Sequence, residues 1–205
     1  FDSDAIRTAI DETGLKAKYI DDESKLIETT VDRLQSGRVI GWFQGRSEWG
    51  PRALGNRSIL ADPRSSEMKD LVNTKIKFRE PFRPFAPAVL AWEAERYFDI
   101  QDVDRQLPTR FMLLVVPVLE SKQDEIRAVN HLGTSRIQAV YPDGNLKYYQ
   151  LIEKFGQASG VPILLNTSFN VRGEPIVNSP QDALRTFADS GIDSLVMGNY
   201  LIDKD

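Results

Sequence analysis

Basic side chains gather in one stretch of the chain, residues 45–87. This stretch holds nine Lys or Arg residues against five Asp or Glu residues, whereas the whole chain carries a net charge of −4. Glycine and proline flank its arginines, as in Gly50-Pro51-Arg52, so turns restrain the backbone that carries the charges. A guanidinium group restrained in this way can form two parallel hydrogen bonds with phosphate oxygens at little entropic cost. The stretch therefore predicts a site for a phosphate-bearing anion.

An ordinary charged surface would explain any single arginine of this stretch. Such a side chain could pair with Glu48, Asp62 or Glu80, which lie in the same stretch. As a group, however, the arginines belong to an otherwise acidic chain, which favours a small polyanion over a nucleic-acid backbone as the ligand. We therefore expect the group to bind an anion.

The composition limits the remaining possibilities. At 205 residues the chain is long enough for one substantial α/β domain. It has no cysteine and a single histidine, which excludes a disulfide framework, a thiolate metal site and a multi-histidine site. No apolar run approaches the about 20 residues needed to span a bilayer, and the acidic, amphipathic first residues are unlike a signal peptide. A cytoplasmic location is the expectation.

Hydrophobic periodicity and turn residues divide the chain into alternating strands and helices. We expect helices over residues 3–12, 22–35, 65–75, 145–157 and 179–190, with a short helical turn over 92–98. We expect strands over residues 38–43, 85–90, 111–119, 135–140, 161–166 and 194–202. Pro84, just before the 85–90 strand, and Pro87 within it suggest a sheet edge, and residues 166–170 are expected to form a polar loop. The alternation predicts an α/β domain with a mixed, twisted sheet.

Three long motifs, GRSEWGPRALGNRSIL, KFREPFRPFAPAVL and LLNTSFNVRGEPIV, closely resemble the C-terminal domain of the O-carbamoyltransferases. That family carbamoylates hydroxyl groups of antibiotics and nodulation factors. The resemblance runs from about Gly37 to the end of the chain. It implies a YrdC-like fold, which is an open, twisted, mixed β-sheet with flanking helices and a concave positive face.

The resemblance also implies a reaction and its participants. In the family, ATP and carbamoyl phosphate form carbamoyl-adenylate and pyrophosphate in this domain, and a preceding actin-like domain transfers the carbamoyl group to a substrate hydroxyl. Residues 1–36 would then be a helical linker from that missing domain, and residues 37–205 the YrdC-like domain. Mg²⁺ is expected to accompany ATP, with the phosphates supplying most of its coordination, and iron is expected only in the actin-like domain. No metal-ligating residue, membrane contact or nucleic-acid partner is predicted here.

Mapped onto the motifs, the resemblance implies specific site residues. Those expected to take part in catalysis are Lys77, Arg83 and Ser168. Those expected to bind the nucleotide are Arg52, Lys77, Arg83, Arg136, Ser168 and Asn170. Second-rank candidates are Arg46, Arg57, Arg79 and Arg172. Arg136 alternates with apolar neighbours, so it is expected on an open face of the sheet.

Other residues whose side chains could take part in chemistry are expected to have structural or surface roles. Glu48 and Glu80 are expected to orient arginines, and His131 is expected to be a surface residue. Trp42 and Trp49 are expected to pack in the core or at a rim rather than to form a platform for adenine.

Two alternatives from other classes stay open. YrdC-like domains also occur in enzymes that make threonylcarbamoyl-adenylate for transfer RNA modification. The negative net charge and the lack of an aromatic and basic strip in the sequence weigh against RNA binding. The other alternative is a non-catalytic module that binds a nucleotide or docks onto another domain.

Overall fold

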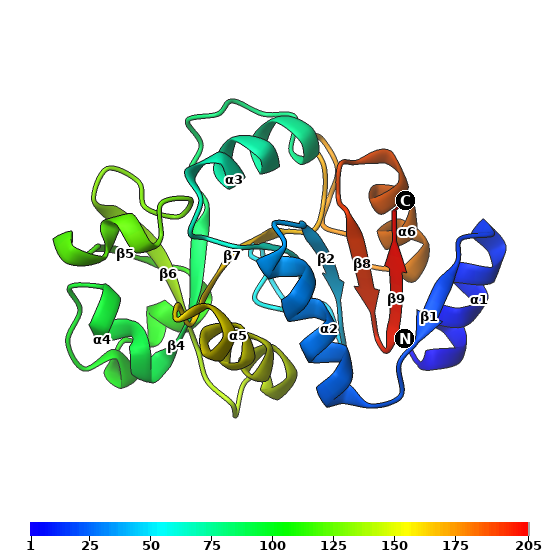
Figure 1. Cartoon of the computed structure of the whole chain (residues 1–205), viewed down its shortest axis with the longest axis horizontal. Coiled ribbons are helices and arrows are strands. Elements are labelled where there is room, and N and C mark those ends of the chain that lie inside the picture. Colours follow the sequence, from blue (N-terminus) through cyan, green and yellow to red (C-terminus); the bar gives the residue numbers. More distant parts are fainter. Residues whose placement is uncertain (205) are drawn as a thin grey trace.

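The structure, a computed structural model, describes residues 1–204 and builds them around one mixed sheet (Figure 1). In these residues nine strands follow the order β1-β9-β8-β2-β3-β7-β4-β6-β5. The strands are β1 Ala17–Tyr19, β2 Ile40–Phe43, β3 Arg57–Ala61, β4 Ala86–Leu90, β5 Leu114–Pro117, β6 Thr134–Val140, β7 Ile163–Ser168, β8 Ser194–Met197 and β9 Tyr200–Asp203. The helices are α1 Ser3–Thr13, α2 Glu23–Gln35, α3 Ser66–Leu71, α4 Ala94–Tyr97, α5 Leu146–Ser159 and α6 Pro180–Asp189. The predicted α/β class with an open mixed sheet is confirmed.

Side chains that alternate along the strands supply a hydrophobic core on each face of the sheet. In β2, Ile40 and Trp42 belong to one core and Phe43 to the other. Helices α2 and α5 lie side by side over the first face, and α1, α3 and α6 contribute to the core on the second. A strand buried on both faces is apolar throughout, which explains why the short run in β2 was recognisable in the sequence.

The helix ends follow local capping rules. Asp2 and Asp22 accept hydrogen bonds from the first turns of α1 and α2 and so cap these helices. Ser179 and Asp182 form a capping box at the start of α6. None of the described helices is long and apolar enough to cross a membrane.

Strand β4 lies inside the sheet, between β7 and β6, so the predicted edge position was wrong. Pro87 pairs in register with Leu165 of β7, whereas the ladder with β6 begins one residue later, at Ala88. The proline therefore stands before the first paired residue on the β6 side. Strand β5, which also contains a proline, does lie at the edge.

Four other elements differ from the predictions. Strand β7 continues to Ser168, so the polar loop expected over 166–170 begins only after that residue. Residues 57–61 of the arginine-rich stretch form the buried strand β3, which the sequence analysis missed. The predicted helix over 65–75 changes at residue 72 into a π-helix, Val72–Ile76. The single strand expected over 194–202 is the hairpin of β8 and β9, which turns at Gly198 with φ of +57°.

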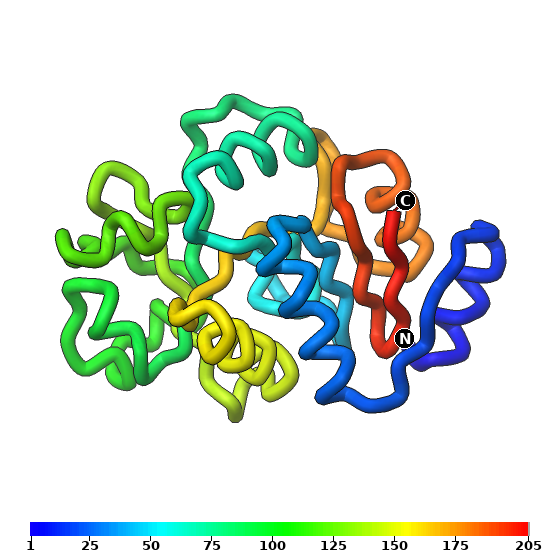
Figure 2. Tube along the Cα trace, in the orientation of Figure 1, coloured from blue at the N-terminus to red at the C-terminus, as the bar shows by residue number. Residues whose placement is uncertain are grey.

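Residues 1–36, expected to be a linker, form α1, β1 and α2. Strand β1 extends the sheet beyond β9, with Ala17 opposite Ile202, and α1 packs against α6. This segment is thus part of the layers around the sheet; its relation to a preceding domain stays a prediction. After α5, the chain returns through β7 to the centre of the sheet, between β3 and β4 (Figure 2).

Candidate functional site

A loop between β2 and β3, residues 44–56, is held in shape by one carboxylate. Glu48 Oε1 accepts hydrogen bonds from the backbone N–H groups of Leu54 at 2.7 Å, Asn56 at 2.7 Å and Arg57 at 3.3 Å. A single carboxylate oxygen thereby satisfies three backbone donors near one turn. Glu48 was expected to orient arginine side chains; instead it fixes the backbone that presents Arg52.

Two amide side chains of the sheet hold this loop from below. Asn166 of β7 donates to Ala53 O at 3.1 Å and to Gln138 Oε1 at 2.8 Å. Gln138 of β6 donates in turn to Leu54 O at 2.9 Å. Both amides are buried, and such groups are stable only when they are hydrogen-bonded. Neither amide had been predicted to have a role.

Three arginines converge on a hollow beside this loop. Arg52 of the loop, Arg79 from the segment before β4 and Arg136 of β6 line a cavity of about 110 Å³, together with Asn166, Thr167 and Ser168 at the end of β7. The strand register explains why these residues lie together. Ala86 of β4 pairs with Asn166 of β7, and Ala88 of β4 pairs with Gln138 of β6. Arg136 precedes Gln138 by two residues on the same face of β6, so it lies in the same row across the sheet as Ala86 and Asn166.

None of these three guanidinium groups forms an ion pair with a carboxylate in residues 1–204. Nε of Arg52 and Nε of Arg136 are buried and have no hydrogen-bond partner there. Burial, and then the positive charge of Arg52, lower the pKa of Arg136. Burial lowers the pKa of Arg79 as well, with Arg83 adding to the effect. Unpaired cations that repel one another favour an anionic ligand between them.

A second hollow, of about 230 Å³, adjoins the first and shares Arg79 and Ser168 with it. Here the structure brings Lys77, Ser168 and Asn170 together. Lys77 Nζ donates to the Ser168 carbonyl oxygen, to Asn170 O at 3.0 Å and to Asn170 Oδ1 at 2.8 Å. Ser168 Oγ donates to Asn170 Oδ1 at 2.8 Å. Lys77 is only 5% exposed, so in this arrangement its ammonium group holds the end of β7.

Burial lowers the pKa of Lys77 to about 7, and the neighbouring Arg79 charge acts in the same direction. In the unfolded chain a lysine titrates near 10.4. Between these values the unfolded chain binds one proton more than the folded chain, so the free energy of unfolding rises with pH. We expect urea unfolding of the wild type to gain up to about 1.4 kcal/mol per pH unit between pH 7.5 and 9.5 relative to Lys77→Met.

Parallel pH profiles for the wild type and Lys77→Met would contradict this expectation. They would mean that the three acceptors around Nζ hold the ammonium form strongly enough to offset its desolvation. A surface substitution, Lys154→Met, serves as the control, because Lys154 is an exposed lysine paired with Glu28 on α2.

The segment that carries Lys77 has an unusual backbone. The π-helix Val72–Ile76 ends at Lys77, whose N–H donates to Val72 O at 2.9 Å. Phe78 then adopts φ of +47°, a conformation that costs a non-glycine residue on the order of 1 kcal/mol or more. Buried Asn73 braces the turn that follows, accepting from Arg79 Nε at 2.7 Å and donating to Pro81 O and Arg83 O. Short π-helical segments such as Val72–Ile76 are frequent at functional sites.

Arg83 lies at the rim of the second hollow, with its side chain 53% exposed, and Nε is 3.0 Å from Glu80 Oε2. An exposed pair of this kind contributes about 0–1 kcal/mol to stability. We expect Arg83→Ala to weaken binding of ATP or carbamoyl phosphate about two- to tenfold and to leave the melting temperature nearly unchanged. The matched variant Glu80→Gln should tighten binding, because it frees Arg83. A fall in melting temperature with unchanged affinity would show that Arg83 only braces its loop.

The second-rank arginines separate into two groups. Arg57 is fully buried, donates to the carbonyl oxygens of Gln44, Gly45 and Asn178, and lies 3.6 Å from the Phe43 ring centroid. It therefore stabilises the base of the loop, and it lines neither hollow. Arg79, in contrast, lines both hollows. Arg172 lines the second hollow, and Arg46 lines neither of the two.

The remaining singled-out residues have ordinary surroundings, with one exception. Trp42 is fully buried and donates from Nε1 to Gly55 O at 2.9 Å, as expected of a core residue. His131 pairs through its backbone with Thr134 and lines neither hollow. Trp49 is fully exposed, which does not fit a packing role.

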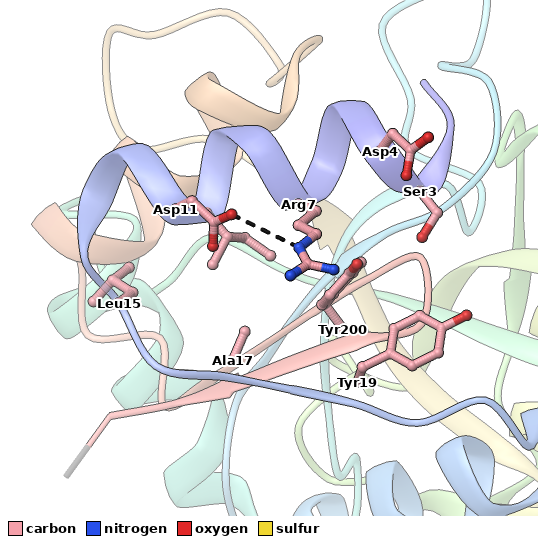
Figure 3. Close-up of a pocket in the computed structure, with 9 residues that line it drawn as sticks. Ser3, Asp4, Arg7, Asp11, Leu15, Ala17, Tyr19 and Tyr200 are labelled. Carbon is pink, nitrogen blue, oxygen red and sulfur yellow. Dashed lines mark ion pairs between the residues drawn. The ribbon is translucent and has the colours of Figure 1, made fainter.

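A larger hollow, of about 620 Å³, lies elsewhere, between α1 and β1 (Figure 3). Its charged side chains are Asp4, Arg7 and Asp11, and Arg7 lies 3.8 Å from Asp11. The figure shows Tyr19 and Tyr200 close together at one side, with ring centroids 5.0 Å apart. This hollow offers no surplus of positive charge, so it does not suit a polyanion despite its size.

The two arginine-lined hollows suit phosphate groups better than a bare metal ion. Across residues 1–204 no three His, Cys, Asp or Glu side chains come together in a metal-binding arrangement.

Known proteins are similar in sequence to this chain over much of its length. Nodulation protein NolNO of Sinorhizobium fredii is 53% identical over 172 residues, which cover 83% of this chain and 25% of that protein. The 3'-hydroxymethylcephem-O-carbamoyltransferase of Amycolatopsis lactamdurans is 38% identical over 169 residues, which cover 81% of this chain and 31% of that protein. The chain thus spans about a quarter to a third of the length of these relatives.

Two solved structures share the fold at low sequence identity. Full-length HypF in the phosphate- and nucleotide-bound form gives a TM-score of 0.58 at 16% identity, covering 86% of this chain and 25% of that one. P. abyssi Sua5 complexed with L-threonine gives a TM-score of 0.55 at 18% identity, covering 87% and 48%. These likenesses confirm the predicted YrdC-like fold. The family model described as "Carbamoyltransferase C-terminus" matches residues 31–204, and the chain therefore belongs to this family.

Proposed function

We propose that this domain binds ATP and carbamoyl phosphate and forms carbamoyl-adenylate in the first stage of an O-carbamoyl transfer. The observation that carries the proposal is the set of three arginines, Arg52, Arg79 and Arg136, which lack a carboxylate partner in residues 1–204 and line one cavity. Membership of the carbamoyltransferase family supports the reaction class, and the two hollows that share Ser168 provide two adjacent basic places for phosphate groups.

The proposed step balances when water takes part. Water cleaves carbamoyl phosphate to carbamate and orthophosphate, and a carbamate oxygen then attacks the α-phosphorus of ATP. The new bond joins carbamate to AMP, and the bond between the α- and β-phosphates breaks to release pyrophosphate. Such a reaction needs positioned cations more than a protein nucleophile, because charge accumulates on phosphate oxygens in the transition state.

The position of each residue determines its proposed role. Arg52, Arg79 and Arg136 hold the phosphates, and their fixed guanidinium groups stabilise the charge that develops there. Lys77 and Asn170 hold the end of β7, which places Ser168 between the two hollows. Arg83 and Arg172 approach from the rim. Mg²⁺, when bound with ATP, would neutralise phosphate charge.

Transfer to the final hydroxyl acceptor is assigned to a preceding actin-like domain, with iron in that domain. The matched segments make up only 25% and 31% of these relatives, which leaves room for such a domain. A cytoplasmic location for the whole protein is proposed with it, in keeping with the nature of the two substrates.

The experiment measures pyrophosphate and orthophosphate release by the purified chain. Release that requires ATP and carbamoyl phosphate together supports the proposal. Binding of ATP by calorimetry without release would favour a non-catalytic nucleotide-binding module. Release with ATP, L-threonine and bicarbonate but not with carbamoyl phosphate would favour a threonylcarbamoyl-adenylate synthase. No heat at millimolar ATP and low salt, with no release, would overturn nucleotide binding itself.

A further inference from the structure

An aromatic cleft of about 340 Å³ lies beyond the arginine hollow, at the end of β6. We define the aromatic cleft by its main lining residues, Trp49, Leu54, Phe111 and Tyr141. Arg110 bounds the cleft, with its guanidinium carbon 3.7 Å from the Tyr141 ring centroid. Trp49 is fully exposed and Phe111 is 46% exposed. Large aromatic side chains left in solvent beside a cleft mark a surface that awaits a partner or ligand.

The aromatic cleft is continuous with the arginine hollow through three segments. On β6, Gln138 lines the cleft and Arg136 the hollow; they are two residues, about 7 Å, apart on one face. In the loop, Leu54 lines the cleft, and Arg52, two residues earlier in the sequence, lines the hollow.

The third connection is between adjacent residues. Phe111 lines the aromatic cleft and Met112 the arginine hollow. Met112 has φ of +54°, a left-handed turn that sends the two consecutive side chains into neighbouring cavities. Loop, strand and turn therefore each contribute one residue to the cleft and one to the hollow.

We propose that the aromatic cleft binds the base of the nucleotide whose phosphates lie against Arg52 and Arg136, with Trp49 stacking on the base. The inference rests on the proposed function. The occupant follows from charge and continuity, because a nucleotide carries a flat aromatic ring at one end and a polyanion at the other. Glu48 holds the loop on both sides of the turn, so Trp49 is presented from a fixed backbone. The earlier interpretation of Trp49 as rim packing is thereby replaced.

The test compares ATP with inorganic tripolyphosphate, which has the charge but no base. Wild type is expected to bind ATP more tightly than tripolyphosphate. Trp49→Ala is expected to weaken ATP binding about tenfold, the usual effect of removing one stacked aromatic, and to leave tripolyphosphate binding unchanged. The matched control is Trp92→Ala, which removes an exposed tryptophan far along the chain, hydrogen-bonded to Tyr149 at 3.0 Å, and should change neither affinity.

The other possible outcomes contradict either the base site alone or the proposed function as well. If wild type binds ATP and tripolyphosphate equally, or if Trp49→Ala weakens both ligands alike or neither, the base site is wrong while the polyanion site stands. If wild type binds neither ligand, the proposed function fails and the base site fails with it. Because Trp49 is fully exposed, the variant should fold normally, and its melting temperature verifies this.

Discussion

Arg136→Ala is expected to weaken binding of ATP about ten- to a hundredfold. This side chain lies beside a cavity, forms no ion pair with a described carboxylate, and has a buried Nε without a partner. A phosphate oxygen would supply the missing acceptor, and a charge-assisted hydrogen bond is worth about 1.5–3 kcal/mol. Arg136→Lys should also bind poorly, because an ammonium group cannot reproduce the two-pronged geometry of a guanidinium group. Calorimetry at low salt measures both variants.

The stability of Arg136→Ala should move in the opposite direction from its affinity. Burial and the charge of Arg52 both lower the pKa of Arg136, which means that the folded protein disfavours the charged group. Removing it should leave the melting temperature unchanged or raise it. The matched control is Arg127→Ala, since Arg127 is an exposed arginine paired with Asp124 at 3.1 Å. Lower stability with normal affinity would contradict the assignment of Arg136 to the anion site.

The site residues were expected from the resemblance to the family, and local rules agree with where some of them lie. Along β6, Arg136 alternates with Ile137 and Ala139; both apolar residues are buried, and Arg136 lines the hollow. Glycine and proline around Arg52 indicated a shaped loop, and the structure shows one that is held by Glu48. Periodicity and turn chemistry operate within a few residues, so a single sequence is enough to detect them.

What could not be predicted depends on contacts between distant segments. Arg57 has the same kind of local sequence as Arg52, yet it is fully buried because its acceptors include Gln44 and Asn178. The sequence offers no sign that Asn178 returns to this place. Strand β3 was hidden for a related reason: Arg57 and Ser58 begin it, and a strand that starts with polar residues resembles a loop until its buried partners are known.

The positioning residues were missed for the same physical reason. Asn73, Gln138 and Asn166 are buried amides, and each holds a backbone segment that carries a predicted ligand. A buried amide is recognisable in sequence only as a polar residue at an inward position of a helix or strand. Asn73, which follows buried Val72 in the predicted helix, offered that signal, but only the structure shows what it holds.

Gly55→Ala is expected to lower the free energy of unfolding by about 2–5 kcal/mol. Gly55 has φ of +107°, and a Cβ atom there would lie 2.2 Å from Cδ1 of Tyr148. Tyr148 is fully buried on α5, so its ring has no free space to enter. Backbone strain and overpacking therefore add. Urea unfolding followed by far-UV circular dichroism measures the loss.

Two further variants separate these two causes. Gly50→Ala, in the same loop, has φ of +119° with no atom within 4 Å of the added Cβ, so it should show the strain without the clash and lose about 1–3 kcal/mol. Tyr148→Leu removes the clashing ring, and the double variant with Gly55→Ala should lose less than the sum of the single losses. Strict additivity would show that Tyr148 is not the obstacle.

The consequence for binding follows from what Gly55 holds. Its carbonyl oxygen accepts from Trp42 Nε1 at 2.9 Å and from Asn145 Nδ2 at 3.3 Å, and its N–H donates to Ser58 Oγ at 3.1 Å. A Cβ at this position would push the loop away from the sheet and draw Arg52 from Arg136. The folded fraction of Gly55→Ala should therefore bind ATP more weakly than wild type, and Tyr148→Leu should restore part of that affinity. Restored stability without restored affinity would mean that the position of Gly55 does not set the position of Arg52.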